Sequence, residues 1–128
     1  MIQFLRRKPR VLLLDDDRSM QKLMATLLRR GGLRVDVVDH GHKAIDAIGQ
    51  VRYDAILLDL MMPHEGGMTV IRHLRENDPE ALQRVILVTA APESVLKTIA
   101  ADVAGVVRKP FQHDDLVSTV RALTSGQA

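Results

Sequence analysis

Short apolar runs alternate with stretches of helical periodicity five times along this chain, and no other sequence feature constrains the fold as much. Each run is rich in Val, Ile, Leu or Ala and predicts a β-strand. The runs are Val11 to Leu14, Leu33 to Val38, Ala55 to Leu58, Val85 to Val88 and Ala104 to Val107. Four of the five are almost continuously apolar, which is typical of strands that are covered on both faces.

Between the runs, apolar residues recur every three or four positions and predict amphipathic helices. The clearest stripe runs from Met20 to Leu28, and the Gly31-Gly32 pair after it is a stop signal. A shorter stripe, Val95, Leu96 and Ile99, predicts a fourth helix. Because each crossover packs its helix back onto the sheet, the alternation predicts one doubly wound α/β domain with a parallel sheet.

The composition fits a folded, soluble domain of 128 residues, 46% hydrophobic and 27% charged. No apolar run approaches the ~20 residues of a membrane span, and the chain begins without a secretory signal, so we expect a cytoplasmic protein with no membrane contact. The absence of cysteine excludes disulfides, thiolate metal sites and a Cys nucleophile.

Basic residues gather at the beginning of the chain, between Arg6 and Arg10, although the formal net charge is only +2. Such a segment can contact nucleic acid or anionic lipid. No stacking aromatic residues accompany it, which favours a solvated extension and predicts no direct nucleic acid binding. We therefore divide the chain into a basic extension (1–8), one domain (9–124) and a tail (125–128).

Chemically reactive residues follow four of the predicted strands. Asp15 and Asp16 end the first strand, Asp59 the third, Thr89 the fourth and Lys109 the fifth. In open α/β sheets, ligands bind beyond the carboxyl ends of the strands, so we expect these side chains to converge at one edge.

These residue types suit phosphoryl transfer. Mg²⁺ prefers oxygen ligands, which Asp15 and Asp16 can supply directly or through water. The carboxylate of Asp59 can form an acyl phosphate when a metal and a lysine neutralise the charge that develops on the transferred oxygens. In this interpretation Lys109 is the point charge, and Thr89 donates a hydrogen bond to the bound phosphoryl group.

Each residue also has a purely structural interpretation. A run of Asp before an amphipathic helix often caps it, and for Asp17 we prefer this interpretation. Thr89 alone is an ordinary strand residue and Lys109 alone an ordinary surface lysine. Asp59 is more informative, because a buried carboxylate after an apolar strand needs a metal or a lysine as its partner. The joint placement of these residues predicts a site.

Several segments resemble the receiver domain of bacterial two-component response regulators, of the single-domain kind similar to chemotaxis regulators. The segments are Leu12-Leu13-Leu14-Asp15-Asp16-Asp17, Leu57-Leu58-Asp59-Leu60-Met61-Met62-Pro63, Gly66-Gly67, Val88-Thr89-Ala90 and Arg108-Lys109-Pro110-Phe111. The resemblance covers roughly residues 9 to 124. It implies a flavodoxin-like (βα)5 fold with strand order 2-1-3-4-5, and it implies a phosphoprotein rather than a turnover enzyme.

The resemblance further implies that a histidine kinase or a histidine phosphotransfer protein phosphorylates Asp59. It implies a Mg²⁺ shell of Asp16, Asp59 and the backbone carbonyl of Met61, with Asp15 acting through water. It also implies a cis peptide bond between Lys109 and Pro110, and cis X-Pro bonds are otherwise uncommon.

The signalling surface implied by the resemblance is the face of the fourth helix, the fifth strand and the fifth helix. Through it we expect contact with a downstream effector or an output domain, or the formation of a homodimer. Few residues follow Leu123, so we expect either a single-domain regulator or one part of a longer chain.

Three positions depart from the receiver pattern. Val106 stands where receivers commonly carry an aromatic residue that moves together with the threonine, which puts that coupling in doubt. Gly66-Gly67 replaces the common Asp-Gly, which should leave the loop freer. Met61 places a long apolar side chain where attacking water approaches, which predicts a phosphoryl group that persists.

Two other functions compete with this interpretation. Asp15 and Asp17 form an Asp-x-Asp pair similar to that of haloacid-dehalogenase-type phosphatases, with Asp15 as the nucleophile. That class generally needs a longer chain and a later acidic pair, whereas Asp114-Asp115 opens a predicted helix. The second alternative is a receiver fold that is never phosphorylated and serves as an interaction platform. Val106 favours it, and the retained acids, Thr and Lys argue against it.

Overall fold

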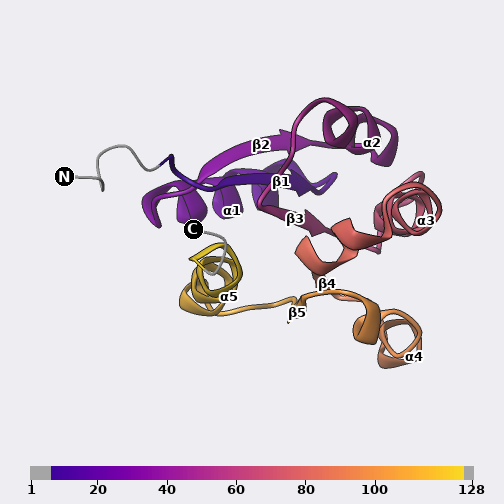
Figure 1. Ribbon diagram of the computed structural model, residues 1–128. Coiled ribbons are helices and arrows are strands. Elements are labelled where there is room, and N and C mark those ends of the chain that lie inside the picture. Colours follow the sequence, from indigo (N-terminus) through magenta and orange to yellow (C-terminus); the bar gives the residue numbers. More distant parts are fainter. Residues whose placement is uncertain (1–6, 126–128) are drawn as a thin grey trace.

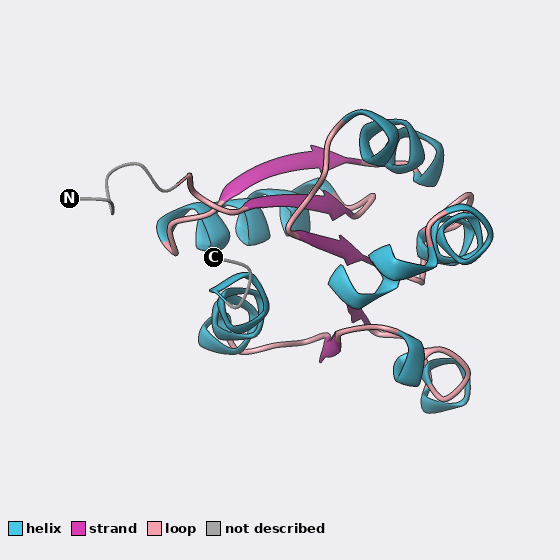
Figure 2. Ribbon diagram, viewed as in Figure 1, coloured by secondary structure: helices cyan, strands magenta, loops and turns pink. Residues whose placement is uncertain are grey.

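Five parallel strands form one central sheet in the computed structural model, which describes residues 7–125 (Figures 1 and 2). The strands are β1 (Arg10–Leu14), β2 (Arg34–Val38), β3 (Ala55–Leu58), β4 (Val85–Thr89) and β5 (Gly105–Arg108). They lie in the order β2-β1-β3-β4-β5, which confirms the predicted order. Each strand begins and ends within one residue of its predicted bounds.

Helices connect the strands and cover both faces of the sheet, as predicted. They are α1 (Arg18–Arg30), α2 (Gly41–Gln50), α3 (Gly67–Asn77), α4 (Glu93–Leu96) and α5 (His113–Ser125), together with the 3₁₀ helices η2 (Pro79–Arg84) and η3 (Ala100–Asp102). In Figure 2, α1 and α5 lie on one side of the sheet, and α2, α3 and α4 lie on the other. None of the helices within residues 7–125 is long and apolar enough to cross a membrane.

A separate hydrophobic core lies on each face of the sheet, because successive strand residues point to opposite faces. On the α2 and α3 side, the strands contribute Leu12, Leu14, Ile56, Leu58, Val85 and Leu87. On the α1 and α5 side, they contribute Val11, Leu13, Ala55, Leu57, Ile86 and Val88. Burial on both faces explains why these strands are continuously apolar.

Helix α1 begins and ends at the residues that the sequence indicates. The Asp17 carboxylate accepts a hydrogen bond from the backbone N–H of Met20 at 3.1 Å, which confirms the interpretation of Asp17 as an N-cap. The helix closes at Gly31, and Gly32 follows with a φ of 90°, a conformation that favours glycine.

Helix α4 is shorter than its apolar stripe predicts. Regular helix ends at Leu96, and the chain then continues through turns into η3. The backbone N–H of Ile99 donates to the carbonyl of Leu96 at 3.1 Å, an i to i+3 bond of the 3₁₀ type. The Thr98 hydroxyl also donates to the Val95 carbonyl at 2.7 Å, and such side-chain bonds compete with the helical pattern. The prediction of regular helix through Ile99 was therefore wrong.

Candidate functional site

The carboxyl ends of β1, β3, β4 and β5 bring four of the predicted site residues into direct contact. Lys109 Nζ donates to Asp15 Oδ2 at 2.6 Å and to Asp59 Oδ2 at 3.0 Å. Thr89 Oγ1 donates to Asp59 Oδ1 at 2.9 Å. The argument from strand ends thus predicted which side chains meet, while their chemical roles stay predictions.

Asp59 lies in a buried position, with a relative exposure of 6%. Its Oδ1 accepts hydrogen bonds from the Thr89 hydroxyl and from the backbone N–H of Met61, the latter at 2.9 Å, while its Oδ2 accepts from Lys109. The backbone N–H of Ala91 in turn donates to the Thr89 hydroxyl at 3.2 Å. A buried carboxylate is tolerated only with such partners, and the pocket provides a partner for each of the two Asp59 oxygens.

Asp15 is also buried, and two neighbouring groups orient it. Its Oδ1 accepts from the backbone N–H of Asp17 at 2.9 Å. The side-chain amide of Gln21 donates to the Asp15 carbonyl oxygen. The sequence-based interpretation did not identify Gln21, although a polar residue directly beside the apolar α1 stripe was the available signal.

Asp16 completes an acidic cluster at the mouth of the pocket. One carboxylate oxygen each from Asp15, Asp16 and Asp59 lie within 4.8 Å of one another, and Asp16 is exposed while the other two are buried. Three carboxylates facing a single lysine leave the pocket with an excess of negative charge. Hard divalent cations prefer such oxygen ligands with one open side for water, so the residues present fit Mg²⁺.

Lys109 keeps its positive charge in this pocket. Burial acts to lower the pKa of its ammonium group, but hydrogen bonds to Asp15 and Asp59 and the charges of those two carboxylates outweigh burial, so the pKa is raised. The lysine therefore remains a permanent cation beside the nucleophile that we predict. The peptide bond between Lys109 and Pro110 is cis, which confirms that prediction.

Two glycines allow the loop after β3 to approach its neighbours closely. The N–H of Gly67 donates to the Asp59 carbonyl at 2.9 Å, and a Cβ at position 67 would lie 2.7 Å from that oxygen. The N–H of Gly41 donates to the Glu65 carbonyl at 2.8 Å, and a Cβ there would lie 2.9 Å from the Gly66 carbonyl oxygen. The interpretation of Gly66-Gly67 as a source of loop freedom missed this steric requirement.

The fold and the acidic, lysine-bridged pocket place this chain among the flavodoxin-like receiver domains of bacterial signalling. The sequence model of the response regulator receiver domain matches residues 11–121. The chain therefore belongs to the response regulator receiver domain family.

Curated relatives support the same assignment. The response regulator MprA of Mycolicibacterium vanbaalenii is 36% identical over 117 residues, which cover 89% of this chain and 49% of the relative. The response regulator MprA of Mycobacterium avium is equally similar, with 50% of its length covered. The chain thus spans about half the length of these relatives.

Solved structures agree with the fold. The receiver domain of the Francisella response regulator 1452 superposes with a TM-score of 0.81 at 27% identity, covering 94% of this chain and 100% of the other. The receiver domain of sensor histidine kinase PA1611 from Pseudomonas aeruginosa gives a TM-score of 0.81 at 26% identity, covering 93% and 99%. The latter structure has a magnesium ion coordinated in its active site cleft.

Proposed function

We propose that this receiver domain takes a phosphoryl group on Asp59 in a Mg²⁺-dependent reaction, with a histidine kinase or histidine phosphotransfer protein as the donor. The observation that carries the proposal is the pairing of Asp59 with Lys109 and Thr89 in a pocket that two further acids complete. A carboxylate held only for stability does not need a second and a third acid beside it, because like charges repel.

Asp59, Lys109 and Thr89 have different roles in the proposed reaction. Asp59 Oδ2 attacks phosphorus, the bond from phosphorus to the donor's imidazole nitrogen breaks, and an acyl phosphate forms. Lys109, which bonds Oδ2 before the reaction, turns its charge to the transferred oxygens. Thr89, already donating to Oδ1, can turn its hydroxyl to the same group. The chain assists its own phosphorylation and dephosphorylation and is not a turnover enzyme on an external substrate.

The metal shell that we propose consists of Asp16, Asp59 and the backbone carbonyl of Met61, with Asp15 acting through water. The cluster of acidic oxygens and the Met61 N–H bond to Asp59 support this set, since that bond fixes Met61 beside the nucleophile. When bound, Mg²⁺ would neutralise charge on the phosphoryl oxygens.

The output surface that we propose is the face of α4, β5 and α5, which would bind a downstream effector or output domain, or a second copy of the chain. Val106 in β5 is half-buried and packs against the core on the α2 and α3 side, so a conformational signal through this strand would lack an aromatic ring. We further propose that the domain runs from residue 9 to residue 124 and that the protein is cytoplasmic.

The test is to incubate the purified chain with acetyl phosphate, with and without Mg²⁺, and to record the intact mass beside an Asp59→Asn control. We expect a single phosphoryl adduct that needs Mg²⁺, is labile to hydroxylamine and is absent from the control. No adduct, under conditions that label a known receiver, would support the unphosphorylated interaction platform instead.

The phosphatase alternative has its own outcome in this experiment. An adduct that survives Asp59→Asn and is lost in Asp15→Asn would make Asp15 the nucleophile. The structure gives no support to that alternative, because the Asp17 side chain caps α1 rather than joining Asp15 in the pocket.

A further inference from the structure

Arginines gather at the amino ends of four neighbouring strands, at the edge of the sheet opposite the acidic pocket. Arg10 and Arg34 are the first residues of β1 and β2 and are partners in the strand register. Arg52 lies three positions before β3, and Arg84 directly precedes β4. Strand β1 has five residues that rise about 3.3 Å each, so its start lies roughly 16 Å from the acidic pocket, and the phosphoacceptor site does not explain the charge at this edge.

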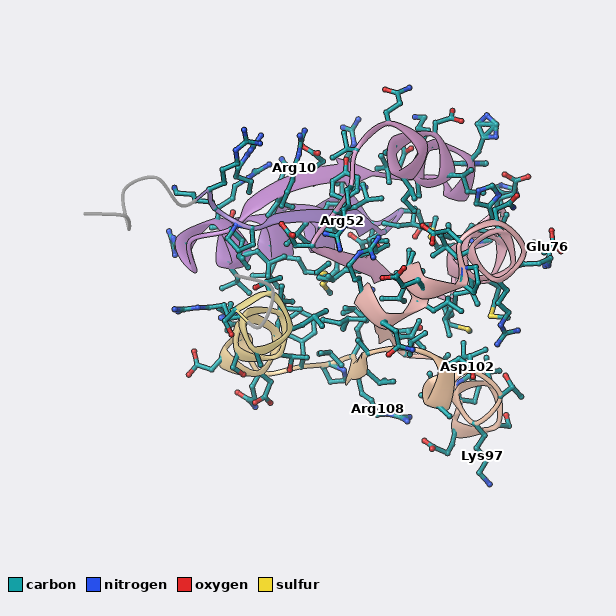
Figure 3. The ribbon with its side chains drawn as sticks, viewed as in Figure 1. Arg10, Arg52, Glu76, Lys97, Asp102 and Arg108 are labelled. Carbon is teal, nitrogen blue, oxygen red and sulfur yellow. The ribbon has the colours of Figure 1, made fainter. Side chains whose placement is uncertain are left out.

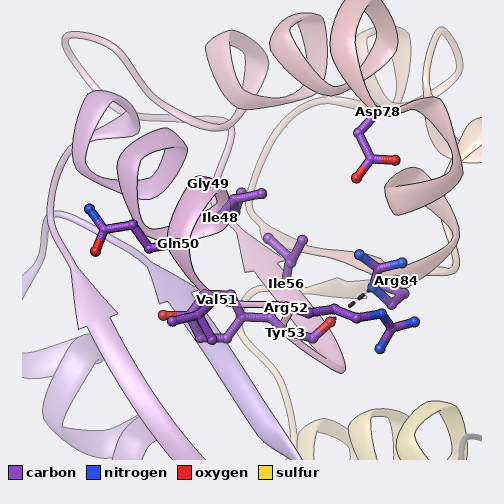
Figure 4. Close-up of a pocket in the computed structure, with 9 residues that line it drawn as sticks. All are labelled: Ile48, Gly49, Gln50, Val51, Arg52, Tyr53, Ile56, Asp78 and Arg84. Atoms are coloured by element: carbon purple, nitrogen blue, oxygen red, sulfur yellow. Dashed lines mark hydrogen bonds between the residues drawn. The ribbon is translucent and has the colours of Figure 1, made fainter.

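A cleft of about 270 Å³ opens at this edge beneath α2 and η2 (Figure 4). Its apolar lining comes from Ile48 and Val51, which are half-buried, while Ile56 is fully buried. Figure 4 shows Arg52 and Arg84 extending to the same side of the cleft, with the Asp78 carboxylate set apart from them. An apolar lining beside two guanidinium groups is the chemistry of a site for a ligand that is both apolar and anionic.

The two arginines retain donors for such a ligand. Arg84 uses Nε to donate to the Tyr53 carbonyl at 2.9 Å, which orients its two Nη groups, and within residues 7–125 it has no ion pair closer than 4.0 Å. The Arg52 side chain is 64% exposed, and its ion pair with Asp54 is long, at 3.7 Å. Arg10 differs, because it donates to Asp36 at 3.0 Å.

We propose that this cleft docks an acidic polypeptide segment of a partner protein, with an aliphatic side chain inside the cleft and flanking carboxylates on Arg52 and Arg84. Guanidinium groups pair with carboxylates through parallel hydrogen bonds. Arg34 at the start of β2 adds a further positive charge beyond the cleft, whereas the charge of Arg10 is met by Asp36.

A polypeptide fits this edge better than a nucleic acid. The aromatic ring at the cleft belongs to Tyr53, which is only 3% exposed, so it offers no surface for stacking bases. The apolar lining gives an aliphatic side chain a place that a phosphodiester backbone cannot use.

The test measures fluorescence anisotropy of a labelled peptide, Glu-Glu-Leu-Glu-Glu, against the full chain. Comparison ligands are the same peptide with Ser in place of Leu and a single-stranded oligonucleotide of equal charge. The variant is Arg52→Glu, whose exposed side chain makes one ion pair within residues 7–125, the long one to Asp54. The matched control is Lys97→Glu, the same charge change at the residue after α4, and Figure 3 shows Lys97 well away from Arg52. Retained phosphorylation at Asp59 would verify that each variant folds.

We expect the Leu peptide to bind most tightly, to lose roughly tenfold in affinity in Arg52→Glu and little in Lys97→Glu, and to weaken as salt rises. Equal binding of the Ser peptide would remove the role of the apolar cleft and overturn the proposal. Tighter binding of the oligonucleotide would assign the edge to nucleic acid and overturn it as well. The same conclusion follows if no peptide binds, or if both variants weaken binding alike.

Discussion

Magnesium should stabilise the chain through the acidic cluster. Because the cation would bind the folded pocket and not the unfolded chain, a hundredfold excess over its dissociation constant should add about 3 kcal/mol to the free energy of unfolding. We expect thermal melts to show this increase in the wild-type chain and a much smaller one in Asp15→Asn. Asp114→Asn, an exposed acid on α5, is the matched control and should respond as the wild type does. Equal responses in both variants would argue against the proposed cluster.

Met61 should slow the loss of the phosphoryl group. Its side chain is 57% exposed beside Asp59, where an apolar group hinders the approach of water. We expect Met61→Asn to hydrolyse its acyl phosphate several times faster, followed as the decay of the adduct mass after removal of the donor. Met68→Asn, at another exposed methionine on α3, should leave the rate unchanged. A decay rate equal to the wild type in Met61→Asn would contradict this role.

The residues of the pocket show how far a sequence can predict a site. Asp15, Asp59, Thr89 and Lys109 meet because each lies at or directly after the carboxyl end of a strand in one parallel sheet, and the apolar runs predict that placement. The contact of Gln21 with the Asp15 carbonyl depends on how α1 rotates against the sheet. The position of Gln21 beside the apolar stripe indicates that it lies near the sheet, but it does not predict this bond.

At the scale of elements, the strands were more predictable than the helices. A strand that is buried on both faces has a continuous apolar run in the sequence. Strand β3 begins and ends at the predicted residues. Helix α4 shows the opposite case, because Val95, Thr98 and Ile99 are β-branched and Thr98 bonds its own turn. Periodicity alone does not reveal such local competition.

A polar network ties β1, β2 and the start of β3 together near the amino edge. The Tyr53 hydroxyl donates to Asp36 Oδ2 at 2.8 Å, and Arg10 donates to the same oxygen at 3.0 Å. Burial, together with the bond to Asp36, raises the pKa of Tyr53 to about 12 from 10.0. Burial would by itself raise the pKa of Asp36, but the bonds from Tyr53 and Arg10 prevail and lower it.

This network should make the chain sensitive to alkali. Because the pKa of Tyr53 is higher in the folded chain, its contribution to stability is complete below pH 10 and is lost as the pH rises towards about 12. We expect Tyr53→Phe to lower the free energy of unfolding by about 1 kcal/mol at neutral pH and to remove this part of the alkaline decline. Urea unfolding at a series of pH values would measure the free energy of unfolding of both proteins. If that free energy fell with pH equally in the wild type and in the variant, the network would not be the cause of the alkaline loss of stability.

At the scale of the whole molecule, one sheet lies between two hydrophobic cores, and the same strands contribute side chains to both. Ile56 and Leu58 of β3 face the core under α2 and α3, while Leu57 faces the core under α1 and α5. Because β3 lies between β1 and β4, damage to either face reaches the strand that presents Asp59. We therefore expect the domain to unfold as a single cooperative unit.

Leu57→Ala should test this cooperativity. The side chain is fully buried, so its truncation should lower the free energy of unfolding by about 2–5 kcal/mol. The far-UV signal of the helices and the fluorescence of a probe at the Asp59 pocket should then shift to the same lower urea concentration. Leu23→Ala, on the exposed face of α1, is the control and should change stability little. Separate transitions for the two signals would show that the cores unfold independently.

The close approach of Gly67 to the Asp59 carbonyl also determines which mutations of the gene the folded protein tolerates. At positions 41 and 67 even a single methyl group would collide with backbone, which no change of rotamer relieves. At Gly49 the same methyl group would meet open space. Glycine codons that mutate at the same rate should therefore differ in how many substitutions persist in a population. Few substitutions should persist at positions 41 and 67, and many at position 49.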